Sequence, residues 1–258
     1  MAGGKTALVA RALERLGLPR DGALLVHSSL RRLGQDGYRL DEVMDALLAH
    51  MVGGTLLMPT MSWRTVKPTS PVFDELATPS NTGALTEHFR TRHASRRSLH
   101  PTHSVAGLGP AAAEILGGHH LDDTPCADRS PFGRLVAQDG WVLMLGIGMD
   151  CCTLVHLVEE KIAPDLYLKP EAATEIYTCR RRTGDDVTVR LRRHLLLPRD
   201  YYQFQDRLAA ADRLAIGMLD NSILRAFRAR DLTACASALL EQRPDAIIAR
   251  PGQRYRMM

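Results

Sequence analysis

The sequence predicts a layered α/β fold, because short apolar runs typical of buried strands alternate with segments of helical periodicity. The clearest strand is the glycine-bounded apolar run 141–145. A helix follows, since apolar residues recur at three- and four-residue spacing from Thr153 until Pro164 ends the pattern. Farther along, segments 174–181 and 187–192 flank a Thr-Gly-Asp-Asp turn. This pattern predicts a small antiparallel hairpin with one solvent-exposed face.

The other elements are expected on the same grounds. Helices are predicted at 6–16, 40–51, 82–92, 110–116, 130–138, 204–219 and 232–242. Strands are predicted at 23–26, 55–58 and 246–249, with a turn at 100–106 entering one more strand. The proline-rich stretch 61–80 is expected to be a loop over the site, and a basic turn is expected around Arg96 and Arg97. No linker or repeat divides the chain, so residues 1–258 are expected to form one domain.

The composition indicates a soluble globular protein. Hydrophobic residues make up 45% of the chain and charged residues 24%. The net charge of +4 is mild, the arginines are scattered and aromatic residues reach only 5%, which disfavours nucleic-acid binding, although a few arginines could serve an anionic cofactor. No apolar run approaches the roughly 18 residues of a membrane span, and the first residues lack a secretory profile, so a cytoplasmic protein is expected.

The cysteines support neither a disulfide framework nor a zinc knuckle. There are five, an odd number, and no CxxC pair occurs. Cys151 and Cys152 lie just before the helix predicted from Thr153, where the helix N-terminus could lower their thiol pKa values. A structural role as buried apolar residues is favoured.

His156 and Glu159 are the strongest candidates for catalysis. Three residues apart on a helix, they share a face, and an imidazole beside a carboxylate is a tuned general base. A solvated surface pair is the alternative interpretation. The preceding Gly-x-Gly lacks the third glycine of a dinucleotide fingerprint because Cys151 stands there.

Two further histidine motifs leave alternatives open. His27 ends a predicted strand, where a structural role is common, and Ser28 and Ser29 after it offer hydroxyls and amides to a phosphate or carbonyl oxygen. A GxSxG elbow is absent, which disfavours a serine hydrolase. His100 and His103 suggest a metal, but no third ligand at helical spacing accompanies them.

Five segments together resemble the aminoglycoside 3-N-acetyltransferase family. They occur in the family's order between residues 25 and 160, and the C-terminal third matches more loosely. The segments are LVHSSL at 25–30, GGTL at 53–56 with Pro59 and Thr60, HPTHSVA at 100–106, SPFG at 130–133, and GIG at 146–148 with Thr153, His156 and Glu159.

The resemblance implies an α/β/α antibiotic N-acetyltransferase-like fold, acetyl-coenzyme A as the donor, and direct transfer to the 3-amino group of a deoxystreptamine ring. It makes His156 the catalytic base, Glu159 its partner and His27 a second active-site histidine. The positions that resemble pantetheine and phosphate contacts are Ser28, Ser29, Thr60, Ser104 and Val105. The chain departs from many relatives just before Thr153, where it has Cys151 and Cys152 and they carry a polar residue. The resemblance therefore does not define the acceptor specificity of this chain.

The chemistry agrees with that assignment. An amine attacks a thioester only when unprotonated, so a base is needed, and amides near residue 153 could stabilise the oxyanion. A polycationic acceptor favours carboxylates near the mouth of the site, for which the candidates, besides Glu159, are Asp122, Asp123, Asp128 and Glu160.

No metal is expected, and the protein is expected to be a monomer or a homodimer. The alternatives are an acetyltransferase for another amine, a metal-dependent hydrolase built on His100, His103 and His156, and a non-catalytic coenzyme A-binding module.

Overall fold

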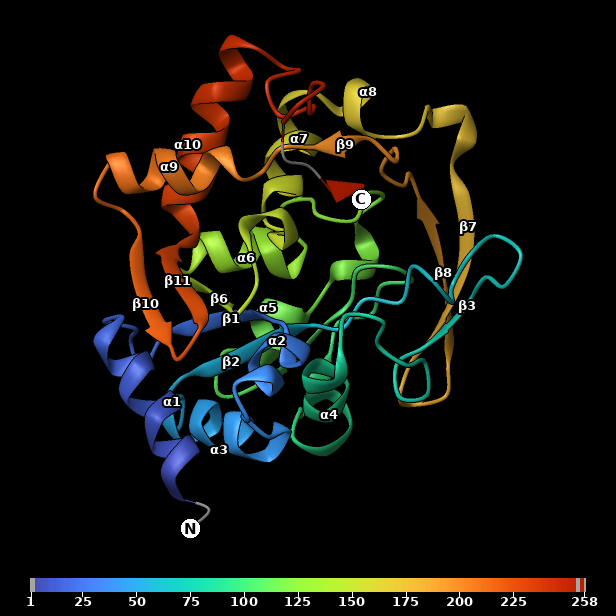
Figure 1. The fold of residues 1–258 in the computed structure, drawn as a ribbon. Helices are drawn as coiled ribbons and strands as arrows, with labels where there is room; N and C mark the ends of the chain where they lie inside the picture. Colours follow the sequence, from blue (N-terminus) through green and yellow to red (C-terminus); the bar gives the residue numbers. More distant parts are fainter. Residues whose placement is uncertain (1–2, 254–255, 258) are drawn as a thin grey trace.

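The computed structural model describes residues 3–253 and 256–257, and its centre is a seven-stranded sheet in the order β10-β11-β6-β1-β2-β5-β4 (Figure 1). The three central strands β6, β1 and β2 are parallel, and the outer strands on both sides pair antiparallel. The strands are β1 Ala23–Ser28, β2 Thr55–Pro59, β4 Arg96–Arg97, β5 Val105–Leu108, β6 Trp141–Leu145, β10 Ala215–Leu219 and β11 Ser222–Arg228.

Helices cover both faces of this sheet and make the predicted three-layer arrangement (Figure 1). One face packs against α1 Gly3–Arg15, α3 Leu40–His50 and α4 Ala84–Arg92. The other face packs against α5 Ala112–Leu116, α6 Pro131–Ala137, α7 Val155–Ile162 and α10 Ala229–Gln242. Shorter or peripheral helices are α2 Leu30–Gln35, α8 Pro164–Tyr167, α9 Gln203–Ala210, and the 3₁₀ turns His119–Leu121, Met149–Cys151 and Glu171–Ala173.

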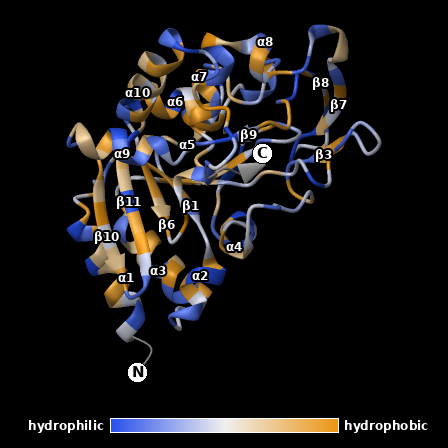
Figure 2. Ribbon diagram, turned by 45° about the horizontal axis from the view of Figure 1, so that its top comes forward, coloured by the Kyte–Doolittle hydropathy of each residue, from blue (hydrophilic) through white to orange (hydrophobic). Residues whose placement is uncertain are grey.

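Alternation along the central strands sends neighbouring side chains into two separate cores. In β1, Leu24 and Val26 join the core under α1 and α3, whereas Leu25 joins the core under α6 and α7. Buried on both faces, β6 and residues 23–26 of β1 are continuously apolar, as is typical of parallel strands, and His27 and Ser28 follow at the end of β1. Figure 2 shows apolar residues in the central strands β1 and β6.

A three-stranded sheet lies to one side of the main sheet and consists of β3 Val72–Asp74, β7 Glu175–Arg180 and β8 Asp186–Leu191 (Figure 1). The predicted hairpin is confirmed as β7 and β8, with Glu175 opposite Leu191. The stretch 61–80 is not wholly a loop, because β3 pairs parallel with β7. The expected basic turn is also different, since Arg97 lies in β4 and is buried, with hydrogen bonds to Thr60.

The C-terminal region corrects two predictions. The helix expected over 204–219 ends at Ala210, and β10 and β11 follow as an antiparallel pair on the edge of the main sheet. The strand expected at 246–249 is only a single bridge between Ile248 and Arg199. Arg199 belongs to β9 Pro198–Arg199, which pairs with β12 Arg256–Met257. No helix among the described residues is long and apolar enough to cross a membrane.

Candidate active site

A cavity of ≈ 320 Å³ opens where the parallel strands of the main sheet end. His27 and Ser28 at the end of β1, Pro59 at the end of β2 and Ile147 just after β6 contribute to its wall. The carboxyl edge of parallel strands is a common place for ligands in α/β folds. Gly146, with φ of 65°, adopts the left-handed backbone that turns the chain out of β6 toward α7.

His156 and Glu159 meet as their spacing predicts. His156 lines the cavity from the first turn of α7, and its Nδ1 lies 2.8 Å from Glu159 Oε2. Glu159 is completely buried, so its carboxylate accepts the Nδ1 proton and the ring keeps Nε2 as its basic nitrogen. The imidazole therefore lies in the wall of the cavity at the carboxyl edge of the sheet.

Glu159 is held ionised by two side chains from after the hairpin. Arg199 donates to both carboxylate oxygens, at 2.8 Å to Oε1 and 3.1 Å to Oε2, and the Tyr201 hydroxyl donates to Oε1 at 2.5 Å. Burial alone would raise the pKa of Glu159, but His156 and Arg199 outweigh it and lower that pKa to about 2. The carboxylate is therefore ionised at pH 7, and its hydrogen bond holds the ring of His156 in place.

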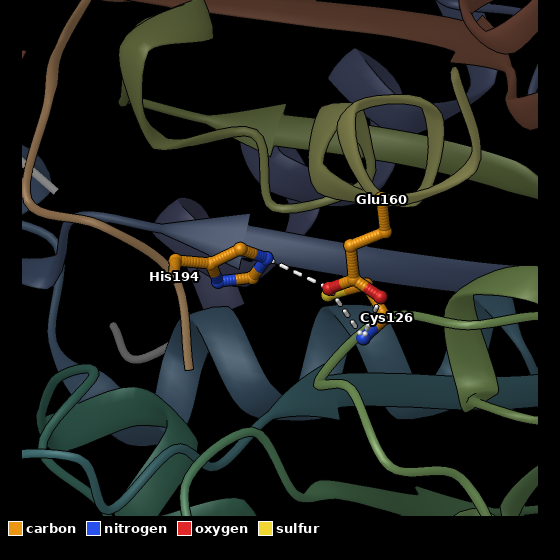
Figure 3. A group of neighbouring side chains, drawn as sticks. All are labelled: Cys126, Glu160 and His194. Carbon is orange, nitrogen blue, oxygen red and sulfur yellow. Dashed lines mark hydrogen bonds and ion pairs between the residues drawn. The ribbon is translucent and has the colours of Figure 1, made fainter. Parts of the chain in front are cut away.

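The neighbouring Glu160 makes a second, different pair (Figure 3). Its Oε1 lies 2.7 Å from Nε2 of His194, and its carboxyl group also accepts from the amide N–H of Cys126. Burial raises the pKa of Glu160 to about 8, because the hydrogen bonds from Thr124 and Cys126 do not offset the lost hydration. His194 also lines the cavity, and its ring stacks on that of His156 with centroids 4.0 Å apart.

His27, at the end of β1, also lines the cavity. It is buried, and desolvation lowers its pKa to about 4, so it is neutral at pH 7. Its Nε2 has no hydrogen-bond partner in the described part of the chain, and neither has Nδ2 of Asn81, another lining residue. Both nitrogens are available to a polar ligand.

The other residues that resemble cofactor contacts divide into two groups. Ser28 lines the cavity, whereas Ser29 precedes α2 and is not part of the wall. Thr60, Ser104 and Val105 are fully buried, and the two hydroxyls receive hydrogen bonds from the Arg97 side chain. In this structure these three residues shape the interior behind the wall rather than its surface.

The loop aspartates lie outside the cavity. Asp122 is buried, and its pKa is raised to about 6 by desolvation. Asp123 is exposed, and Asp128 is exposed beside Lys161 at 3.4 Å. Contacts between these carboxylates and a ligand in the cavity are therefore not supported by their positions.

The structure does not bring His100, His103 and His156 together as one ligand set. Nδ1 of His100 accepts from the amides of Thr102 and His103, and the His100 ring stacks on His119. Two other groups of donors lie within 4.8 Å among the described residues, namely Cys126 with Glu160 and His194, and His156 with Glu159 and His194. Their donors bond one another, and burial raises the pKa of the Cys126 thiol well above its usual value, which disfavours the thiolate that metals prefer.

Several site residues could not be found from the sequence. His194, Arg199 and Tyr201 follow the hairpin in a segment without periodicity, and nothing local connects them to α7. Trp63 and Arg64 line the cavity from the stretch 61–80, for which the sequence predicts a cover over the site without any particular contact. Proline content and irregularity are the only signals there.

The fold and the cavity define an α/β/α protein with a buried imidazole–carboxylate pair beside a cavity at the carboxyl edge of its sheet. A family model for aminoglycoside 3-N-acetyltransferase matches residues 25–241. The chain belongs to the aminoglycoside 3-N-acetyltransferase family. The predicted family and enzyme class are confirmed, and the likeness to solved structures confirms the predicted fold class.

Two sequence relatives illustrate the extent of the match. Aminoglycoside N(3)-acetyltransferase IV of Salmonella sp. is 32% identical over 271 aligned residues, which cover 98% of this chain and 94% of that protein. A prophage-derived aminoglycoside N(3')-acetyltransferase-like protein of Bacillus subtilis is 30% identical over 171 residues. That second alignment covers 58% of this chain and only 62% of the relative.

Two solved structures share the fold over nearly the whole chain. A histidine-to-alanine mutant of aminoglycoside acetyltransferase AAC(3)-IVa in complex with a gentamicin has a TM-score of 0.77 and 27% identity, covering 97% of this chain and 94% of that chain. AAC-IIIb in binary complex with CoASH has a TM-score of 0.77 and 24% identity, covering 96% and 99%.

Proposed function

We propose that this protein transfers the acetyl group of acetyl-coenzyme A to the 3-amino group of the 2-deoxystreptamine ring of aminoglycosides, and so gives antibiotic resistance. The observation that carries the proposal is the His156–Glu159 pair at the wall of the cavity, in a member of this family. We treat residues 1–258 as one catalytic domain.

His156 is the general base in this proposal. The attacking amine carries a proton that must leave as the C–N bond forms, and Nε2 of a neutral imidazole can take it. Glu159 fixes the tautomer through Nδ1 and stabilises the resulting imidazolium. The proton then passes to the departing coenzyme A thiolate, so the ring returns to its starting state.

The oxyanion of the tetrahedral intermediate needs donors close to the same helix. Thr153 lines the cavity just before α7, and its amide N–H donates to no acceptor in the described part of the chain. Such an amide at a helix start is suited to a developing negative charge. The orphaned nitrogens of His27 and Asn81 offer further contacts to polar groups of a ligand.

Two arginines at the cavity suit the anionic cofactor. Arg64, which lies over the Trp63 ring at 4.9 Å, and Arg193 both line the wall. They would attract the phosphates of coenzyme A and repel a polycationic acceptor. Arg64→Gln should therefore raise KM for acetyl-coenzyme A about tenfold, the loss of about one charge-assisted hydrogen bond, with little change in kcat.

The test is the release of free thiol from acetyl-coenzyme A in the presence of gentamicin, with wild type and His156→Ala compared. Loss of a general base typically costs about a hundredfold or more, so the mutant should be nearly inactive while still binding gentamicin. Turnover that survives the mutation would place the base elsewhere, with His27 next to be changed. Thiol release with other amines but not with any aminoglycoside would favour an acetyltransferase of different specificity.

A further inference from the structure

Two adjacent glutamates of α7 each hold a histidine that faces the same cavity. Glu159 bonds Nδ1 of His156, and Glu160 bonds Nε2 of His194 (Figure 3). The chain thus carries two imidazole–carboxylate pairs, although a single base accounts for the attack on the thioester.

The two rings are placed to act on one ligand group. They stack with centroids 4.0 Å apart and an interplanar angle of 21°, and both line the cavity. Nδ1 of His194 makes no hydrogen bond to the described part of the chain, so it has a lone pair or a proton to offer. An ammonium group in the cavity could therefore be reached by Nε2 of His156 and by Nδ1 of His194.

The reaction of an aminoglycoside requires the loss of two protons from one nitrogen. The amino group reaches the enzyme largely as an ammonium, which is not nucleophilic, and one proton must leave before attack. The second leaves during attack and is accounted for by His156. We propose that the Glu160–His194 pair is the acceptor of the first proton, a role that rests on the proposed function.

The proton transfer balances within the pair. With Glu160 ionised and the proton of His194 on Nε2, an N–H bond of the ammonium breaks as an N–H bond forms at Nδ1. The Nε2 proton moves to Oε1 of Glu160 across the 2.7 Å contact. His194 remains neutral throughout, so no second imidazolium forms beside His156. The products are a free amine and a protonated Glu160, which returns its proton to solvent after turnover.

The surroundings match the basicity of this pair to that of an amine. Burial raises the pKa of Glu160 to about 8 and lowers that of His194 well below its usual value, so in the empty cavity the proton rests on the carboxyl group. In the proposed sequence the positive charge of the bound aminoglycoside lowers the pKa of Glu160 and drives that proton to solvent, which leaves Glu160 ionised before it accepts the proton of the ammonium group. The titratable or charged groups around the pair are His100 and His103 before β5, Asp122 and Cys126 before α6, His156 and Glu159 on α7, and Arg193 and Arg199 after the hairpin.

The test is the pH dependence of kcat/KM for gentamicin in wild type, Glu160→Gln, His194→Gln and His156→Ala. At pH 7 the Glu160 and His194 variants should lose about tenfold to a hundredfold. At a pH of about 9.5 a far larger fraction of the amine enters unprotonated than at pH 7, so both variants should recover to within about threefold of wild type. His156→Ala should stay defective at both pH values, because its proton leaves during attack.

A purely structural role would lower kcat/KM by the same factor at both pH values, and that result would overturn the proposal. Full activity of Glu160→Gln at pH 7 would also overturn it. Thermal unfolding of each variant guards against misfolding, and a folded His194→Gln suffices if Glu160→Gln does not fold. No thiol release by wild type at any pH would contradict the proposed function itself, and the role of the pair with it.

Discussion

Glu159 and Glu160 are neighbours on one helix, are both buried, and differ in charge state. The pKa of Glu159 is lowered to about 2, and that of Glu160 is raised to about 8. Burial acts in the same direction on both carboxyl groups. The difference comes from their partners, because Arg199 pairs with Glu159 and no cation within hydrogen-bond distance pairs with Glu160 in the described part of the chain.

The comparison teaches that position on a helix does not decide what a carboxyl group can do. In the proposed mechanism Glu159 is a permanent anion that orients the base, which requires that it never take the proton itself. In the same proposal Glu160 exchanges a proton, which requires that no cation hold it ionised. A cation supplied from β9, far along the chain, separates the two roles.

Removal of the Arg199 guanidinium should reduce the pKa difference between Glu159 and Glu160. Arg199→Ala leaves Glu159 buried without its ion pair, so its pKa should rise and the free energy of unfolding should fall by about 3–5 kcal/mol. Urea unfolding at pH 7 measures the loss. Arg228→Ala is the matched control, because its pair with Asp139 is partly exposed and should be worth less than about 1 kcal/mol. Equal stability of Arg199→Ala and wild type would contradict the account.

Glu160→Gln should change how stability depends on pH. The folded-state pKa of about 8 lies above the unfolded value of 4.5, so the folded state binds the proton more tightly between them. Stability from this group is present below pH 4.5 and is lost as pH rises toward 8, by up to about 1.4 kcal/mol per pH unit.

Urea unfolding from pH 5 to 8 should therefore show a shallower decline in Glu160→Gln than in wild type. Glu14→Gln, at an exposed ion pair with Arg20, should leave the slope unchanged. An equal decline in wild type and Glu160→Gln would show that the carboxyl group is ionised throughout this range and would contradict the account.

Tyr201→Phe should lower the free energy of unfolding by less than Arg199→Ala does. The Tyr201 hydroxyl donates to the carboxylate, and a hydrogen bond to a charged group is worth about 1.5–3 kcal/mol. Tyr167→Phe removes a hydroxyl that donates to the neutral carbonyl oxygen of Pro244, which should cost about 1 kcal/mol. Thermal or urea unfolding compares them, and an equal cost would mean that the charge of Glu159 adds nothing.

A chelator should have the smallest effect. The donors of Cys126, Glu160 and His194 are engaged with one another or protonated, so thiol release after dialysis against EDTA should match the untreated enzyme. Activity that disappears on dialysis and returns with zinc would instead make this group a metal site and revive the hydrolase alternative.

The sequence predicts the fold well where the pattern is local. The strand Trp141–Leu145 and the hairpin after Pro170 are defined by composition and turn residues within a few positions. Strands β10 and β11 are missed because an edge pair with exposed Ile216 and Met218 lacks the buried pattern of a strand. Their pairing with β6 is a tertiary interaction that no local period reveals.

The residues of the candidate site also fall into those that local spacing reveals and those that only the tertiary structure brings together. His156 and Glu159 could be found because a spacing of three positions on a helix brings two side chains into contact. The sequence predicts Glu160 at the mouth of the site, but its real partner, His194, lies 34 positions away. Arg199 and Tyr201 reach Glu159 only because the chain returns over α7 after the hairpin, and no spacing encodes that return.

The most direct test of the account is the protonation state of the two neighbouring carboxyl groups. In protein with ¹³C-labelled glutamate side chains, Glu159→Gln and Glu160→Gln assign the two carboxyl signals, and a pH titration follows each. The account predicts that Glu159 stays a carboxylate throughout, while Glu160 is a carboxylic acid at pH 6 and titrates near a pH of about 8. Two ionised carboxylates at pH 6 would contradict it.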